Sequence, residues 1–175
     1  IVNRLGDFGF ALGIFAVFFL VDSINFADIF AAAPEIAETE ITFLWTSWNA
    51  AELIAFLLFI GAMGKSAQLF LHTWLPDAME APTPISAYLH AAAMVKAGVF
   101  LVARSVVATA DVPPRVAMLL GAMALVTMFV ALSYYFIQDD LKRLLAYSTI
   151  AHLGYVLLGL ALGALGSSAA LQGGI

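Results

Sequence analysis

The chain has 175 residues, of which 63% are hydrophobic and 11% charged, and its formal net charge is −5. Soluble domains carry about 25% charged residues, so this composition excludes an ordinary soluble domain and indicates an integral membrane protein. Cysteine is absent, which excludes a disulfide framework. The sequence also has no basic patch of the kind that binds nucleic acid.

Five apolar stretches are long enough to cross a bilayer, which takes roughly 20 residues of helix. Lipid cannot satisfy open backbone groups, so we expect each stretch to be helical. The predicted fold class is therefore all-α, a polytopic bundle of about five transmembrane helices. The expected spans are residues 5–22, 50–74, 84–107, 114–138 and 144–165.

The first residues, IVNRLGDFGF, contain no initiator methionine, basic n-region or cleavage site. We therefore expect no signal peptide, and a chain that is a piece of a longer protein. Residues 23–49 form a long acidic segment without Lys or Arg, which we interpret as an outer loop. Arg4, Lys142 and Arg143 would then lie on the cytoplasmic or matrix side.

The connection 139–143, DDLKR, is short and charged. It predicts an antiparallel helical hairpin joined by a solvated loop whose charges compensate one another. Thr83 followed by Pro84 is typical of a helix start, and so is Pro113 followed by Pro114.

Two lysines lie deep within expected spans. A lysine near the bilayer centre costs at least ~2.5–3.5 kcal/mol unless water or a partner relieves it. Lys65 lies sixteen residues into the second span, and Lys96 lies near the middle of the third. Two such lysines on adjacent helices favour a role in proton transfer. The alternative is that each is neutral, or paired with a carboxylate for helix packing.

A polar stripe is predicted on the second span. In a continuous helix, Gly61, Gln68 and His72 lie within about 60° of Lys65. Gly61 and Gly64 would permit close helix approach or a locally irregular helix. Such a stripe can hold the ordered water that proton transfer needs. Alternatively, Gln68 and His72 only form interhelical hydrogen bonds.

Two further histidines fall in the later spans. His90 and Lys96 are six residues apart, about 120° around a regular helix, so we expect different roles for them. An imidazole suits a proton relay, although a lone His in a helix is often a packing residue. His152 shares a face with Ser148 and Tyr155, and either continues a proton path or cross-links helices.

No motif supports covalent chemistry. The sequence has no glycine-rich phosphate loop after a strand, no metal-ligand cluster and no nucleophile set beside a base. We therefore expect no cofactor or metal site, and no self-contained enzyme. Ionisable residues within a polytopic chain point first to ion or proton conduction.

At these residues the chain resembles a known family. The block GKSAQLFLHTWLPDAMEAPTPISAYLHAAAMVKAGVFLVAR closely resembles the core of the antiporter-like subunits of respiratory complex I. That superfamily also includes the large subunit of multisubunit Na⁺/H⁺ antiporters. The resemblance extends to both sides of this block, to NRLGDFGFALGIF before it and DDLKRLLAYSTIAHLGYVLLGL after it. The chain is most similar to the distal subunit, called subunit L in bacteria and subunit 5 in mitochondria.

The resemblance implies roles for individual residues. Lys65 matches the central lysine of the first half-channel, and His90 matches the histidine that relays protons from it. Lys96 matches a lysine of the sister subunits and of the antiporter type, a departure from the distal pattern. The resemblance also implies a partner glutamate for Lys65 on a preceding helix. That glutamate is missing, so we expect Lys65 to lack its acid in this chain.

The resemblance also implies an architecture of two inverted five-helix repeats. Residues 1–107 would be the last three helices of a first repeat, and residues 108–175 the first two of a second. The chain is thus expected to be a fragment of an inverted-repeat antiporter-like fold.

By resemblance, the expected function is proton translocation within NADH–quinone oxidoreductase, through a relay of Lys65, His72, His90, Lys96 and His152. The protein would be a multi-pass subunit in a bacterial or mitochondrial inner membrane, in contact with lipid and other membrane subunits. NADH, FMN, iron–sulfur clusters and quinone would bind partner subunits, with no redox chemistry in this chain. The alternatives are the large subunit of a Na⁺/H⁺ antiporter, or a scaffold whose charges lock helices together.

Overall fold

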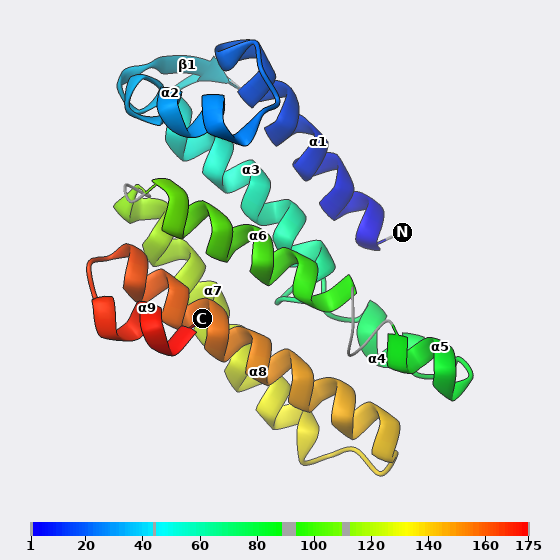
Figure 1. Ribbon diagram of the computed structural model, residues 1–175. Helices are drawn as coiled ribbons and strands as arrows, with labels where there is room; N and C mark the ends of the chain where they lie inside the picture. The colour runs from blue at the N-terminus through cyan, green and yellow to red at the C-terminus, as the bar shows by residue number, and fades with distance from the viewer. Residues whose placement is uncertain (1, 44, 89–93, 110–112, 175) are drawn as a thin grey trace.

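Long helices lie side by side along a common axis in the computed structural model, which describes residues 2–43, 45–88, 94–109 and 113–174 (Figure 1). Helix α1 (Val2–Val21) lies against α3 (Ala50–Lys65), and α7 (Pro114–Tyr135) lies against α8 (Leu141–Ala164). The segment with α2 (Phe26–Glu38) and β1 (Glu40–Phe43) lies at one end of this bundle. The short helices α4 (Trp74–Ala78) and α5 (Thr83–Ala87) lie at the opposite end.

Three of the five expected spans are single helices long and apolar enough to cross a membrane. They are α1 (Val2–Val21), α7 (Pro114–Tyr135) and α8 (Leu141–Ala164). Pro114 is the first residue of α7, as its position predicts, because its missing N–H removes no helical hydrogen bond there. The all-α polytopic fold class is confirmed.

The second expected span is not a continuous helix, and the third has its residues 89–93 outside the described ranges, so one helix over 84–107 stays a prediction. The second divides into α3 (Ala50–Lys65) and α4 (Trp74–Ala78), joined by the irregular segment 66–73. The third contains α5 (Thr83–Ala87) and α6 (Met94–Thr109). The prediction of one helix over 50–74 is therefore wrong. The irregularity that Gly61 and Gly64 allowed falls directly after Lys65.

Residues 23–49 are more ordered than the predicted loop. They form α2 (Phe26–Glu38) and a hairpin of β1 (Glu40–Phe43) with β2 (Thr46–Asn49), in which Thr42 pairs with Ser47. The Asn25 side chain accepts the Ala27 N–H at the start of α2. The Asn49 side chain likewise accepts the first N–H groups of α3. These caps explain why both helices begin where they do.

The core joins the long helices to one another. Side chains of α3, α6, α7 and α8 form its largest buried cluster, which includes Phe59, Val102, Leu120, Leu157 and Leu160. A last helix, α9 (Ser168–Gly174), folds back on α8, where Gly174 lies against Gly159. The predicted division of the chain near residue 107 adjoins residues 110–112, which lie outside the described ranges, and it stays a prediction.

Candidate functional site

An ion pair joins α1 to the end of α3. The Lys65 ammonium lies 2.8 Å from a carboxylate oxygen of Asp7, and each side chain is about one-third exposed, at 36% and 35%. Lys65 is the last residue of α3, where a cation also favourably meets the helix dipole. The expectation that Lys65 would lack an acid in this chain is wrong.

Asp7 also has a second cationic neighbour. A guanidinium nitrogen of Arg4, one turn earlier on α1, lies 3.8 Å from its other oxygen. The Arg4 side chain is 88% exposed, so water screens this contact much more than the Lys65 contact. The carboxylate is therefore shared unequally between a close amine and a distant guanidinium.

Close packing of glycines brings Asp7 to Lys65. Gly6 of α1 faces Gly64 of α3, and a Cβ built on Gly6 would lie 3.0 Å from the Gly64 Cα. Each ionic residue directly follows one of these two glycines in the sequence. Small residues at a helix contact indicate tight helix packing in membranes. Gly6 is therefore a signal in the sequence that would have pointed to Asp7.

Side chains from several elements hold the break after Lys65. The Ser66 hydroxyl donates to the Val95 carbonyl at the start of α6, at 2.9 Å. The Trp74 indole N–H donates to the Gly64 carbonyl at 3.0 Å. The Gln68 amide donates to the Ser66 carbonyl at 3.0 Å. The bonds of Trp74 and Gln68 supply donors to the Gly64 and Ser66 carbonyls, which lose their helical partners at the break.

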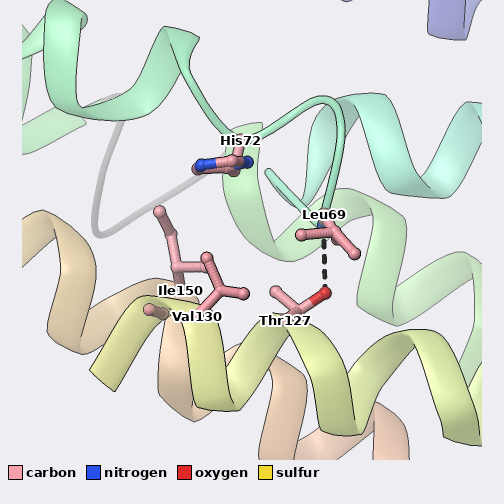
Figure 2. Close-up of a pocket in the computed structure, with 6 residues that line it drawn as sticks. Leu69, His72, Thr127, Val130 and Ile150 are labelled. Carbon is pink, nitrogen blue, oxygen red and sulfur yellow. Dashed lines mark hydrogen bonds between the residues drawn. The ribbon is translucent and has the colours of Figure 1, made fainter. Parts of the chain in front are cut away.

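His72 lies beyond the break rather than on the predicted stripe. The stripe of Gly61, Lys65, Gln68 and His72 assumed a continuous helix, and that assumption is wrong. The imidazole lines a small pocket with Leu69 and with α7 and α8 residues that include Thr127, Val130 and Ile150 (Figure 2). Its Nδ1 is buried and has no hydrogen-bond partner among the described residues.

The other candidate residues lie apart from this pair. Lys96 is exposed, near the start of α6, one residue after the Val95 carbonyl that holds Ser66. His152 is exposed on α8, with Nδ1 2.7 Å from the Ser148 carbonyl within the same helix. His90 lies outside the described residues. Within the described ranges, no contact joins Lys96 or His152 to Lys65.

Two further ion pairs join segments that are distant in the sequence. Glu52 of α3 lies 3.9 Å from Arg115 of α7, and Glu80 lies 3.0 Å from Arg143 of α8. We expected the charges of 139–143 to compensate one another, but Arg143 pairs with Glu80, outside this segment. Arg143 lies in the first turn of α8, while the Asp140 carboxylate caps that helix by accepting the Lys142 N–H.

The described residues hold no group of three or more His, Cys, Asp or Glu side chains that would bind a metal ion. The charged and polar groups of the site are Lys65, Asp7 and the side chains of the break, which form an ion pair and donate hydrogen bonds to backbone carbonyls.

A protein-family model described as NADH:quinone oxidoreductase/Mrp antiporter, transmembrane, matches residues 1–175. The chain belongs to this antiporter family. Membership confirms the resemblance seen in the sequence. Together with three membrane-length helices, it also confirms a multi-pass protein of an energy-transducing membrane, as in bacterial and mitochondrial relatives.

Individual members of the antiporter family are similar over most of this chain. NADH-quinone oxidoreductase subunit L of Rhodobacter capsulatus is 59% identical over 156 residues, which are 89% of this chain and 22% of that protein. NADH-ubiquinone oxidoreductase chain 5 of Chondrus crispus is 49% identical over 157 residues, 90% of this chain and 23% of that one.

A solved structure of the Mrp complex from a Dietzia species contains a similar chain. Its TM-score is 0.75 at 35% identity, over 97% of this chain and 17% of that one. The chain thus spans less than a quarter of the length of each of these relatives.

Proposed function

We propose that this chain is part of an antiporter-like, proton-translocating subunit of NADH–quinone oxidoreductase. The 59% identity to a subunit L supports this over the Na⁺/H⁺ antiporter alternative, since the Mrp neighbour is 35% identical. Other membrane subunits and the bilayer are its partners. NADH, FMN, iron–sulfur clusters and quinone bind those partner subunits, which perform the redox chemistry.

The observation that carries the proposal is the 2.8 Å contact between Lys65 and Asp7. A negative charge at this distance stabilises the positive charge of the Lys65 ammonium through a direct, charge-assisted hydrogen bond. When Asp7 turns toward Arg4, Lys65 loses this close counter-charge. The Lys65 ammonium then gives its proton to the next acceptor and becomes a neutral amine. It takes up a new proton from water on the input side of the membrane when the Asp7 carboxylate returns.

The break after Lys65 gives the proton a direction. Here the backbone leaves the helix and His72 follows, with a buried Nδ1 available to accept or pass a proton. We assign the later steps to His90 or Lys96, and then to His152 on α8. The order of these later residues is a hypothesis that follows the family resemblance and their sequence positions.

The test is proton transport by the complete protein within its parent complex, reconstituted in vesicles, with Lys65→Ala. Lys142→Ala is the matched control, because it removes a lysine outside the site. We expect both variants to assemble and to oxidise NADH. Lys65→Ala alone should lower the number of protons moved per NADH.

Other results would decide against the proposal in different ways. An unchanged proton-to-NADH ratio in Lys65→Ala would exclude conduction through Lys65. Failure of that variant to assemble would favour the scaffold alternative. Cation-dependent exchange with no NADH-linked activity in the parent complex would assign the chain to the antiporter class.

A further inference from the structure

A single side chain of α7 holds the irregular segment beside Lys65. The backbone N–H of Leu69 donates to the Thr127 hydroxyl oxygen at 3.0 Å (Figure 2). Ala67 and Phe70, on either side of Leu69, have positive φ values of 49° and 70°, so the backbone here is far from helical. Leu69 therefore needs a partner outside its own segment.

The orientation of the Thr127 hydroxyl is fixed by a second hydrogen bond. Its oxygen donates to the Met123 carbonyl, one turn earlier on α7, at 2.6 Å. That bond uses its one proton, so a lone pair faces Leu69. The residue is only 2% exposed, so bulk solvent does not reach this hydroxyl.

The Thr127 bond differs from the other bonds of the break. Those of Gln68 and Trp74 return to the segment itself or to α3, and that of Ser66 reaches α6. Thr127 instead belongs to α7, which lies beyond the predicted boundary between repeats. Its hydroxyl thus connects the surroundings of Lys65 to a helix of the predicted second repeat.

We propose that Thr127 is a positioning residue that couples the position of α7 to the backbone between Lys65 and His72. The coupling rests on the proposed function of Lys65 in proton transfer. A shift of α7 moves Leu69 through this hydrogen bond. His72, three residues later, lines the same pocket as Thr127, so its ring moves with the segment.

The experiment compares Thr127→Val with Thr127→Ser in the complete protein within its parent complex. Valine keeps the shape of threonine and removes the hydroxyl, whereas serine keeps the hydroxyl and removes the methyl group. Ser133→Ala is the matched control on α7, because the Ser133 hydroxyl bonds within its own helix, to the Phe129 carbonyl. Lys65→Ala is measured in parallel.

Two quantities are measured: protons moved per NADH, and amide hydrogen exchange of the peptide 66–73. Thr127→Val should lower the proton ratio while NADH oxidation is unchanged. It should also speed exchange at Leu69 by about two- to tenfold, the equilibrium factor of one lost hydrogen bond. Thr127→Ser should restore both quantities, and Ser133→Ala should change neither.

A normal proton ratio in Thr127→Val would overturn the inference. So would loss of assembly in that variant, because the hydroxyl would then serve folding rather than positioning. Failure of serine to restore function would overturn it too, since the methyl group would be the essential part. If Lys65→Ala pumps normally, the proposed function fails, and the inference fails with it. If Lys65→Ala alone loses pumping, the inference fails and the proposed function stands.

Discussion

Gly6 of α1 and Gly64 of α3 face each other so closely that a side chain on either would meet the backbone of the other. A Cβ built on Gly6 would lie 3.0 Å from the Gly64 Cα, and the converse distance is the same. Asp7 and Lys65, the next residues in each helix, form the ion pair at 2.8 Å. The glycine contact therefore sets the separation of the charged groups.

Gly6→Ala tests this relationship. The methyl group would press on backbone atoms that cannot rotate away, so the two helices must separate. Overpacking of this kind costs typically ~1–3 kcal/mol. We expect a lower thermal stability and a lower proton-to-NADH ratio, because Asp7 moves away from Lys65.

The matched control is Gly13→Ala on the same helix. A Cβ there meets the Leu58 side chain first, with Cδ2 at 3.0 Å and Cγ at 3.2 Å, and the position lies about two helical turns from Gly6. Its effect on proton transport should be much smaller. Equal losses in both variants would show that general packing of α1, rather than the Asp7 position, controls transport.

Asp7→Asn keeps the shape of the side chain and removes its charge. Both partners are about one-third exposed, so we expect the substitution to remove about 1 kcal/mol of interaction free energy between the two side chains. That is roughly a fivefold change in the equilibrium between paired and released Lys65. Proton transport per NADH should fall while assembly persists. The readout is vesicle acidification at matched NADH oxidation.

Arg4→Gln provides the contrast for Asp7→Asn. Arg4 is 88% exposed and lies 3.8 Å from Asp7, so its removal should change stability by less than about 1 kcal/mol. We expect the proton ratio to stay near that of the parent. A larger loss in Arg4→Gln than in Asp7→Asn would mean that Arg4, rather than Lys65, is the principal partner of the carboxylate.

The sequence predicts the long helices well, because the length of an apolar run is a local property. Residues 2–21, 114–135 and 141–164 each form one helix close to the expected span. The caps of α2 and α3 were also local signals, since Asn25 and Asn49 are typical N-cap residues. Both caps were missed because 23–49 was interpreted only by its charge.

The break after Lys65 was not predictable in detail. Its backbone groups bond to Thr127 and Val95, which are distant in sequence, and hydropathy carries no record of such contacts. Asp7 was missed although Gly6 beside it was an available signal, because its partner is set by the packing of α1 on α3. The relay through Lys65, His72, His90, Lys96 and His152 stays a prediction, with His90 outside the described residues.

Trp74→Phe removes an indole N–H and keeps an aromatic ring. The Gly64 carbonyl would lose the donor that lies 3.0 Å away at the last turn of α3. We expect a stability loss of about 1 kcal/mol, the usual net value of one hydrogen bond. Thermal unfolding of the purified complex measures it. Trp48→Phe in the hairpin, where the ring is 41% exposed, is the control and should change little.

Arg143→Gln tests the ion pair that connects α8 to Glu80. The pair is partly exposed, so the loss of stability should stay within about 1 kcal/mol and should shrink at high salt. Arg115→Gln removes a longer contact of 3.9 Å and should have a smaller effect. An equal effect at low and high salt would contradict an electrostatic origin.

The most direct test of the Lys65–Asp7 account is a double-mutant cycle on proton transport. The proton-to-NADH ratio is measured for the parent complex, Asp7→Asn, Lys65→Ala and the double variant in the same vesicles. If Asp7 acts through Lys65, the double variant transports no less than Lys65→Ala alone. If the two losses instead multiply, Asp7 and Lys65 act independently and the account is wrong.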